Sequence, residues 1–188
     1  MSATAAPVRG STGRTGVGVG RRLRRLAYGA YYLVPPRLRR RVVRLVMARY
    51  TVGAVALVSD AERPGYLLLL RQPHAVGWSL PAGLLKRGER PVDGCVRELH
   101  EETGLLVSAD EMTPAVPNAV IHTHGMWVDT VFEARVPASA VALEPDGLEV
   151  VAAGWHHRDS LPPLTLATAR LLSYYGMGPY ADYPEIRT

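Results

Sequence analysis

The chain carries the sequence GLLKRGE at residues 83–89 and, after seven further residues, RELHEETGL at residues 97–105. Three glutamates of the second segment, Glu98, Glu101 and Glu102, stand at positions i, i+3 and i+4, so on an α-helix their side chains leave one face. Carboxylates placed in this way repel one another, whereas a hard divalent cation needs several carboxylate oxygens directed at one point. The pattern therefore predicts a metal site, and Mg²⁺ fits it best because Mg²⁺ keeps waters and completes its shell with substrate phosphate oxygens.

The residues around these glutamates predict a helix over 91–103. Pro91 is acceptable in a first helical turn, and Glu89 lies near the positive N-terminal end of the helix dipole. Gly104 stands where a left-handed C-cap is expected. Gly94 lies inside the helix and costs about 1 kcal/mol relative to alanine, so we expect it to pack closely against another element.

Together the two segments resemble the Nudix box, a family motif of glycines, glutamates and one arginine at fixed spacing. Every fixed position of that motif is matched, namely by Gly83, Glu89, Arg97, Glu98, Leu99, Glu101, Glu102, Gly104 and Leu105. A motif this long is far more specific than a short glycine-rich pattern, and its alternative is an acidic helix face that only contacts solvent. The resemblance implies a Nudix fold, an α/β/α sandwich with a mixed β-sheet, over residues 50–176.

The same resemblance implies hydrolysis of a diphosphate linkage, with water as the nucleophile. Glu98, Glu101 and Glu102 would hold or serve Mg²⁺, for which Mn²⁺ could substitute, and the backbone carbonyl of Gly83 would be a further ligand. Arg97 would pair with Glu89 or Glu101 and keep the carboxylates in the conformation that binds the metal. A bound metal lowers the pKa of its water, and a free carboxylate takes the proton.

The identity of that proton acceptor stays open. Glu98 is the first candidate within the box. Because the base of a Nudix enzyme can also lie outside the box, Asp129, Glu133 and Glu144 are the alternatives.

The flanking sequence agrees with such a fold. Residues 51–58 and 66–71 are apolar, β-branched or aliphatic runs that predict buried strands. Residues 127–136 alternate as a strand with one solvated face does, and 149–155 is a further strand candidate. Residues 164–175 have apolar side chains at helical spacing and predict a closing amphipathic helix.

Charge divides the chain into unlike parts. Residues 1–50 contain twelve arginines and no acid, whereas residues 51–188 contain ten Lys and Arg against seventeen Asp and Glu. The composition predicts a disordered basic tail over 1–20 and an Arg-rich amphipathic helical extension over 21–49. The resemblance implies the Nudix domain over 50–176, which leaves a C-terminal tail over 177–188. Within the extension, Leu38, Val42, Leu45 and Val46 share one helix face.

Three roles are open for this extension: packing onto its own domain or onto a homodimer partner, binding an anionic membrane surface, or binding nucleic acid. The apolar residues 26–34 are too few to span a bilayer and have no clear cleavage site, so we expect neither a transmembrane helix nor a signal peptide. Cys95 is the single cysteine, which excludes an intramolecular disulfide and favours a reducing cytoplasmic location.

The substrate class is less determined by the sequence. The segment Trp78–Gly83 resembles Nudix enzymes that act on ADP-ribose and nucleotide sugars, and a nucleoside triphosphate is the other candidate substrate. Stacking on a base is expected from Trp78, Tyr66 or Trp127, although aromatic residues also serve as core. Candidates for phosphate contacts are the basic residues near the box, namely Arg71, Lys86, Arg87 and Arg90.

A pair of histidines and a function without catalysis are the remaining alternatives. His122 and His124 share one face of a strand and could bind metal or phosphate, but without a third ligand a solvated or hydrogen-bonded pair is the simpler interpretation. The rival to an enzyme is a catalytically silent Nudix-like module that senses a ligand or binds a protein. Such modules often lose box carboxylates, and this chain keeps all of them.

Overall fold

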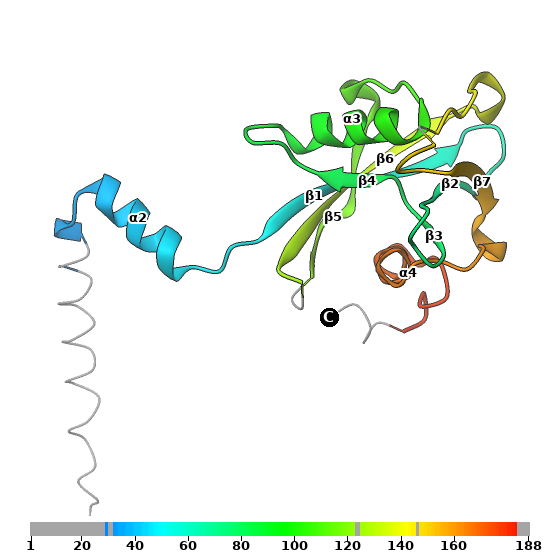
Figure 1. Ribbon diagram of the computed structural model, residues 1–188. Helices are drawn as coiled ribbons and strands as arrows, with labels where there is room; N and C mark the ends of the chain where they lie inside the picture. The colour runs from blue at the N-terminus through cyan, green and yellow to red at the C-terminus, as the bar shows by residue number, and fades with distance from the viewer. Residues whose placement is uncertain (1–28, 30–31, 123–124, 146, 184–188) are drawn as a thin grey trace, which may run out of the picture. The chain divides into compact units, whose positions relative to one another are not determined.

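The structure is a computed structural model that describes residues 29, 32–122, 125–145 and 147–183 (Figure 1). It divides into two units, Met1–Arg49 and Tyr50–Thr188, and each unit is described by itself. The predicted basic tail, most of residues 21–34, and His124 lie outside the described residues. No helix in the described ranges is long and apolar enough to cross a membrane.

The first unit contains helix α2, Pro36–Val46. Pro36 occupies the first helical position, where its missing N–H costs nothing. The helix ends because Met47 has an extended backbone, and the guanidinium of Arg49 donates to the carbonyl of Arg44 at 3.1 and 2.9 Å. Within the helical extension predicted over 21–49, the helix that carries Leu38, Val42, Leu45 and Val46 therefore forms and ends at Val46.

The second unit is built on a mixed sheet of seven strands. Its central strand β1, Thr51–Asp60, pairs in parallel with β6, Trp127–Val136, along its whole length. The antiparallel strands around this pair are β2 (Tyr66–Arg71), β3 (Trp78–Ser79), β4 (Ala82–Leu84), β5 (Thr113–His122) and β7 (Ala152–His157). Strand β4 pairs with the first half of β1, and β2 meets β1 near its end.

Helices cover both faces of this sheet, α3 (Pro91–Thr103) on one and α4 (Leu166–Ser173) on the other (Figure 1). Successive side chains of β1 enter two separate cores, because a strand directs neighbouring residues to opposite faces. Ala54 and Ala56 join the core that contains Leu99 of α3, whereas Val55 joins the core that contains Leu172 of α4. The predicted α/β/α sandwich with a mixed sheet is confirmed.

Several predicted elements occur where the sequence placed them. Strands β2 and β6 and helix α3 have the predicted bounds, and β1 extends two residues beyond Val58. The strand expected at 149–155 lies at 152–157, and the closing helix is shorter than 164–175.

Strand β5 was not predicted. It contains Pro114 and Pro117, and proline inside a run argues against a strand because it cannot donate to the ladder. The structure accommodates both prolines by a register shift between Pro114 and Ala119 at the edge of the sheet.

Candidate functional site

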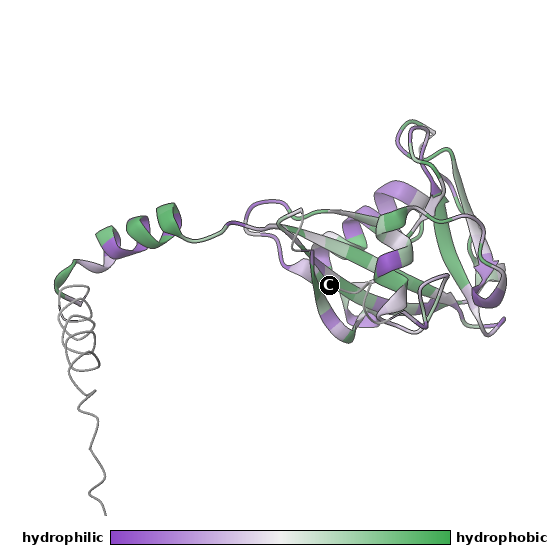
Figure 2. Cartoon of the chain, turned by 90° about the horizontal axis from the view of Figure 1, so that it is seen from below, coloured by the Kyte–Doolittle hydropathy of each residue, from purple (hydrophilic) through white to green (hydrophobic). Residues whose placement is uncertain are grey.

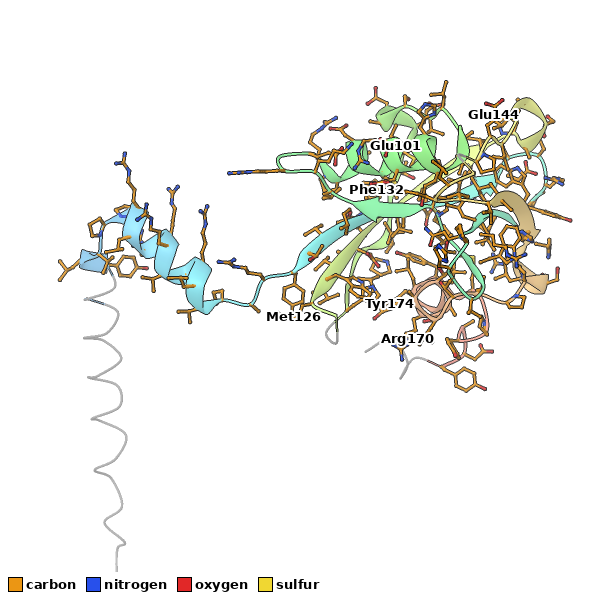
Figure 3. All side chains as sticks on the ribbon, in the orientation of Figure 1. Glu101, Met126, Phe132, Glu144, Arg170 and Tyr174 are labelled. Atoms are coloured by element: carbon orange, nitrogen blue, oxygen red, sulfur yellow. The ribbon has the colours of Figure 1, made fainter. Side chains whose placement is uncertain are left out.

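Helix α3 carries the three glutamates to the strand β4. The helix begins with Pro91 at its first position and ends at Gly104, whose φ of 73° is the left-handed cap expected for glycine. Glu102 is 7% exposed, and its carboxylate accepts a hydrogen bond from the backbone N–H of Ala82 at 2.9 Å. Glu101, labelled in Figure 3, lies on the outer side of α3, where its side chain is 52% exposed.

Glu98 lies against the backbone of Gly83. A Cβ atom at position 83 would be 2.0 Å from the carboxyl carbon of Glu98 and 2.2 and 2.3 Å from its two oxygens. Any side chain at this position would therefore displace the carboxylate. Glycine is needed in β4 because it leaves the space in which Glu98 sits between helix and sheet.

Arg97 ties the box together. Its guanidinium donates to both oxygens of Glu89 at 2.9 and 3.0 Å, and its Nη1 donates to Glu98 at 2.7 Å and Glu101 at 3.0 Å. A further bond at 3.1 Å joins Nη2 to the carbonyl of Leu84. Arg97 thus pairs with both carboxylates named for it in the sequence and also with Glu98, and these bonds raise the pKa of its guanidinium.

Glu89 fixes the loop between β4 and α3. Its hydrogen bonds with Arg97, and then the bond of 2.7 Å from the N–H of Lys86, lower the pKa of its carboxyl from 4.5 to about 2. The loop also folds closely onto the helix, since a Cβ at Gly94 would lie 2.5 Å from a methyl group of Leu85. The close packing predicted for Gly94 is confirmed.

These groups fit a hard divalent cation. Glu98 and Glu102 bring carboxylates to either side of Gly83, whose carbonyl is a further oxygen donor. Within the described parts of the chain, no three Asp, Glu, His or Cys side chains already converge as ligands of one ion. Mg²⁺ does not require that, because it usually takes only one or two carboxylates directly.

Strand β6 brings a further carboxylate to the same place. Asp129 pairs with Gly53 of β1, and a Cβ at Gly53 would lie 3.1 Å from Oδ1 of Asp129 and 3.3 Å from the carbonyl oxygen of Gly83. The two oxygens therefore border one small space above Gly53. The other carboxylate oxygen of Asp129 lies 2.8 Å from Nε2 of His122, and the ring of His122 packs against Trp127 at 5.1 Å.

The two remaining alternatives for the base lie elsewhere. Glu133 is four residues farther along β6, opposite Thr113. The backbone N–H of Glu144 donates to the carbonyl of Thr103 at 2.8 Å, at the C-terminal end of α3. Of the three residues named outside the box, the structure brings only Asp129 next to Gly83.

The residues predicted to bind substrate separate into two places. Arg71 and Trp78 face each other as partners on β2 and β3. Tyr66 lies at the opposite end of β2, where it contacts the guanidinium of Arg63 at 4.5 Å and the ring of His157 at 5.2 Å. The structure thus brings Arg71 and Trp78 together and leaves Tyr66 apart from them.

Trp78 contacts His156, a residue that no sequence pattern assigned to the site. The ring of His156 meets the indole edge to face at 4.4 Å, and burial lowers the pKa of this histidine. Its Nε2 atom is buried and makes no hydrogen bond within the described part of the chain. His157, the next residue of β7, contacts Tyr66 instead, and the contact with Trp78 shows that His156 adjoins a candidate site residue.

The basic residues of the loop have their own partners. Nζ of Lys86 lies 3.7 Å from Glu101, and Arg90 forms two bonds of 2.6 Å with Asp93. Arg87 is exposed.

Comparison with known proteins agrees with this geometry. The profile of the NUDIX domain matches residues 47–175. The chain is 32% identical over 134 residues to the mouse 8-oxo-dGDP phosphatase NUDT18, covering 69% of this chain and 37% of that protein. It is 37% identical over 91 residues to a MutT-like protein of Streptomyces ambofaciens, covering 48% of this chain and 54% of the relative.

Among solved structures, a MutT NUDIX hydrolase from Burkholderia pseudomallei superposes with a TM-score of 0.52 at 28% identity, over 64% of this chain and 93% of that one. The chain spans about a third to a half of the length of the curated relatives it matches. Because the NUDIX profile covers more than half of the sequence and includes the whole site around Gly83 and α3, the chain belongs to the Nudix hydrolase family.

Proposed function

We propose that this protein hydrolyses a diphosphate linkage in a nucleoside diphosphate derivative with Mg²⁺ as cofactor. One observation carries the proposal: Glu98 lies in a space that only glycine at position 83 leaves open, while Arg97 holds Glu89, Glu98 and Glu101 together. A helix face that merely contacted solvent would need neither feature. An intact cluster of this kind supports catalysis rather than simple packing.

Each box residue has a proposed role. Glu98, Glu101 and Glu102 and the carbonyl of Gly83 would hold or serve the metal, and a bound metal would neutralise charge at the phosphate oxygens and lower the pKa of water. Arg97 is a positioning residue, because it acts on substrate only through the carboxylates it binds. Glu98 accepts the proton from the attacking water, and Asp129 is the alternative because its Oδ1 borders the same space as the Gly83 carbonyl.

The substrate is proposed from the site and from the relatives. Arg71 and Trp78 are cross-strand partners, so a residue whose guanidinium can bind phosphate and one whose indole can stack on a base occupy neighbouring positions of the sheet. The mouse relative is named for 8-oxo-dGDP, a nucleoside diphosphate. Nucleoside diphosphates and triphosphates, ADP-ribose and nucleotide sugars are therefore the classes to test first, and Tyr66 is the weaker candidate for a base contact.

The rival function is a module that binds such a ligand without cleaving it. The two functions can be distinguished by measurement. An enzyme cleaves its ligand and loses cleavage when a box carboxylate is removed, whereas a binding module binds the ligand equally well with or without that carboxylate. The intact box favours the enzyme.

The test is Mg²⁺-dependent release of product from 8-oxo-dGDP, dGDP, nucleoside triphosphates, ADP-ribose and nucleotide sugars. Wild-type protein is compared with Glu102→Gln and with Asp182→Asn, a control that removes an exposed carboxylate outside the site. We expect one class to be cleaved by the wild type and the control but not by Glu102→Gln. Absence of cleavage, with ligands raising the melting temperature of wild type and Glu102→Gln equally, would support the binding module instead.

A further inference from the structure

The N-terminal part of the chain has an unusual charge composition. Residues 1–59 contain twelve arginines and neither aspartate nor glutamate. Five of these arginines lie in helix α2, which therefore cannot neutralise its charge by ion pairs within itself. Nothing in the diphosphate chemistry of the Nudix domain accounts for this helix.

The helix separates its charge from its apolar residues. At about 100° per residue, four of the five arginines occupy one arc of about 100°, and Leu38, Val42, Leu45 and Val46 occupy another of similar width. The fifth arginine, Arg39, lies next to Val46 at the edge of the apolar arc. Figure 2 shows this division as hydrophilic and hydrophobic residues on opposite sides of α2. The helix is therefore amphipathic, with Arg41 and Arg39 at the two edges of its apolar arc.

No described residue of the first unit covers the apolar face of α2. No residue of the helix is buried, and Leu45 and Val46 are 79% and 74% exposed. A helix of eleven residues is below the roughly 12–15 residues at which isolated helices become even marginally stable in water. The helix therefore gains stability from any surface that removes its apolar face from water.

Different partners would use different parts of this helix. An acidic protein surface or a nucleic acid would contact the arginines and leave the apolar arc in water. A hydrophobic protein groove would cover the apolar arc and leave the arginines unused. A lipid surface takes both, because the apolar arc enters the boundary of the acyl chains while the arginines remain at the level of the phosphate groups.

We propose that α2 docks on an anionic lipid bilayer, lying in the plane of its surface. The partner is recognised by its chemistry: hydrocarbon beneath a layer of negatively charged headgroups. Tyr32, whose ring lies 5.5 Å from the guanidinium of Arg39, adds an aromatic side chain of the kind that favours this boundary. The inference concerns α2 alone and does not rest on the proposed hydrolysis.

The test is sedimentation of the full-length protein with vesicles of phosphatidylcholine alone and of phosphatidylcholine mixed with phosphatidylglycerol. Leu45→Glu places a charge in the apolar arc, and Leu106→Glu is the matched control, because Leu106 of the Nudix domain is also 79% exposed. We expect binding to the mixed vesicles only, weakening with salt. Leu45→Glu should reduce the affinity on the order of tenfold and Leu106→Glu should leave it unchanged.

Three results would overturn the proposal. One is absence of binding to the mixed vesicles, and another is equal binding by Leu45→Glu and wild type, which would mean that charge alone is responsible. The third is tighter binding of the wild type to a single-stranded RNA oligonucleotide than to the mixed vesicles, again unaffected by Leu45→Glu. That result would assign the helix to nucleic acid.

Discussion

Helices α2 and α3 begin in the same way but differ in the sign and pairing of their charges. Both start at a proline, both are rich in charged residues, and they differ by two residues in length. In α3 the charges are of both signs and meet partners, with Arg97 binding three glutamates and Asp93 binding Arg90. In α2 every charge is positive. A network of ion pairs therefore forms at α3 and not within α2, because only α3 has charges of opposite sign within hydrogen-bonding distance.

The largest expected effect concerns burial. Leu99 of α3 is fully buried, so Leu99→Ala should lower the free energy of unfolding by about 3 kcal/mol through lost burial and a cavity. Leu45→Ala in α2 should change it by less than about 0.5 kcal/mol, since this side chain is 79% exposed. Urea unfolding of both variants measures the contrast. An equal loss in the two would mean that α2 is part of the cooperative fold.

A smaller effect, on catalysis, is expected at the contact between α3 and β4. Gly83→Ala forces the Glu98 carboxylate away, and a displacement near 1 Å can cost about a hundredfold in kcat/KM. The control is Gly29→Ala, where an added Cβ would meet nothing within 4 Å. The measurement is kcat/KM for whichever of the compounds tested under the proposed function is cleaved. An unchanged kcat/KM in Gly83→Ala would show that the position of the Glu98 carboxylate beside residue 83 is not needed for catalysis.

The smallest effect is a pH dependence that α3 and the loop before it should show and that α2, which has no acidic residue, should not. The bonds from Arg97 lower the pKa of Glu89 to about 2 in the folded protein, against 4.5 ordinarily. The stability from this group is therefore complete above about pH 4.5 and is lost as the pH falls toward 2, because the unfolded chain binds the proton first.

Glu89→Gln should remove this contribution. Unfolding measured at pH 7 and at pH 3 should show a smaller loss on acidification in the variant than in the wild type. Parallel losses in the two proteins would contradict the pairing of Glu89 with Arg97 as the cause.

The sequence predicted α3 well because its information is local. Pro91 marks the start of the helix and Gly104 its end. The three glutamates lie within five consecutive residues, so their common face follows from helix geometry alone. The strand β2 could be predicted from an unbroken apolar run, and β6 from apolar and polar residues that alternate as in a strand with one solvated face.

What the sequence could not predict depends on pairing at a distance. Asp129 borders Gly83 only because β6 pairs in parallel with β1, so that Asp129 lies beside Gly53 and Gly53 beside β4. No local pattern records that register. Tyr66 looked as suitable as Trp78 for a base, but the pairing of β3 with β2 places Trp78 opposite Arg71, at the other end of β2 from Tyr66.

The central claim is that α3 and Gly83 form a site for a divalent cation, and metal binding itself tests it most directly. Mn²⁺ binding to the full-length protein, followed by electron paramagnetic resonance, is measured for wild type, Glu98→Gln and the Asp182→Asn control. We predict that Mn²⁺ binds the wild type and the control alike and that Mg²⁺ displaces it. Glu98→Gln should bind on the order of tenfold more weakly. Equal affinity in all three proteins would contradict the account.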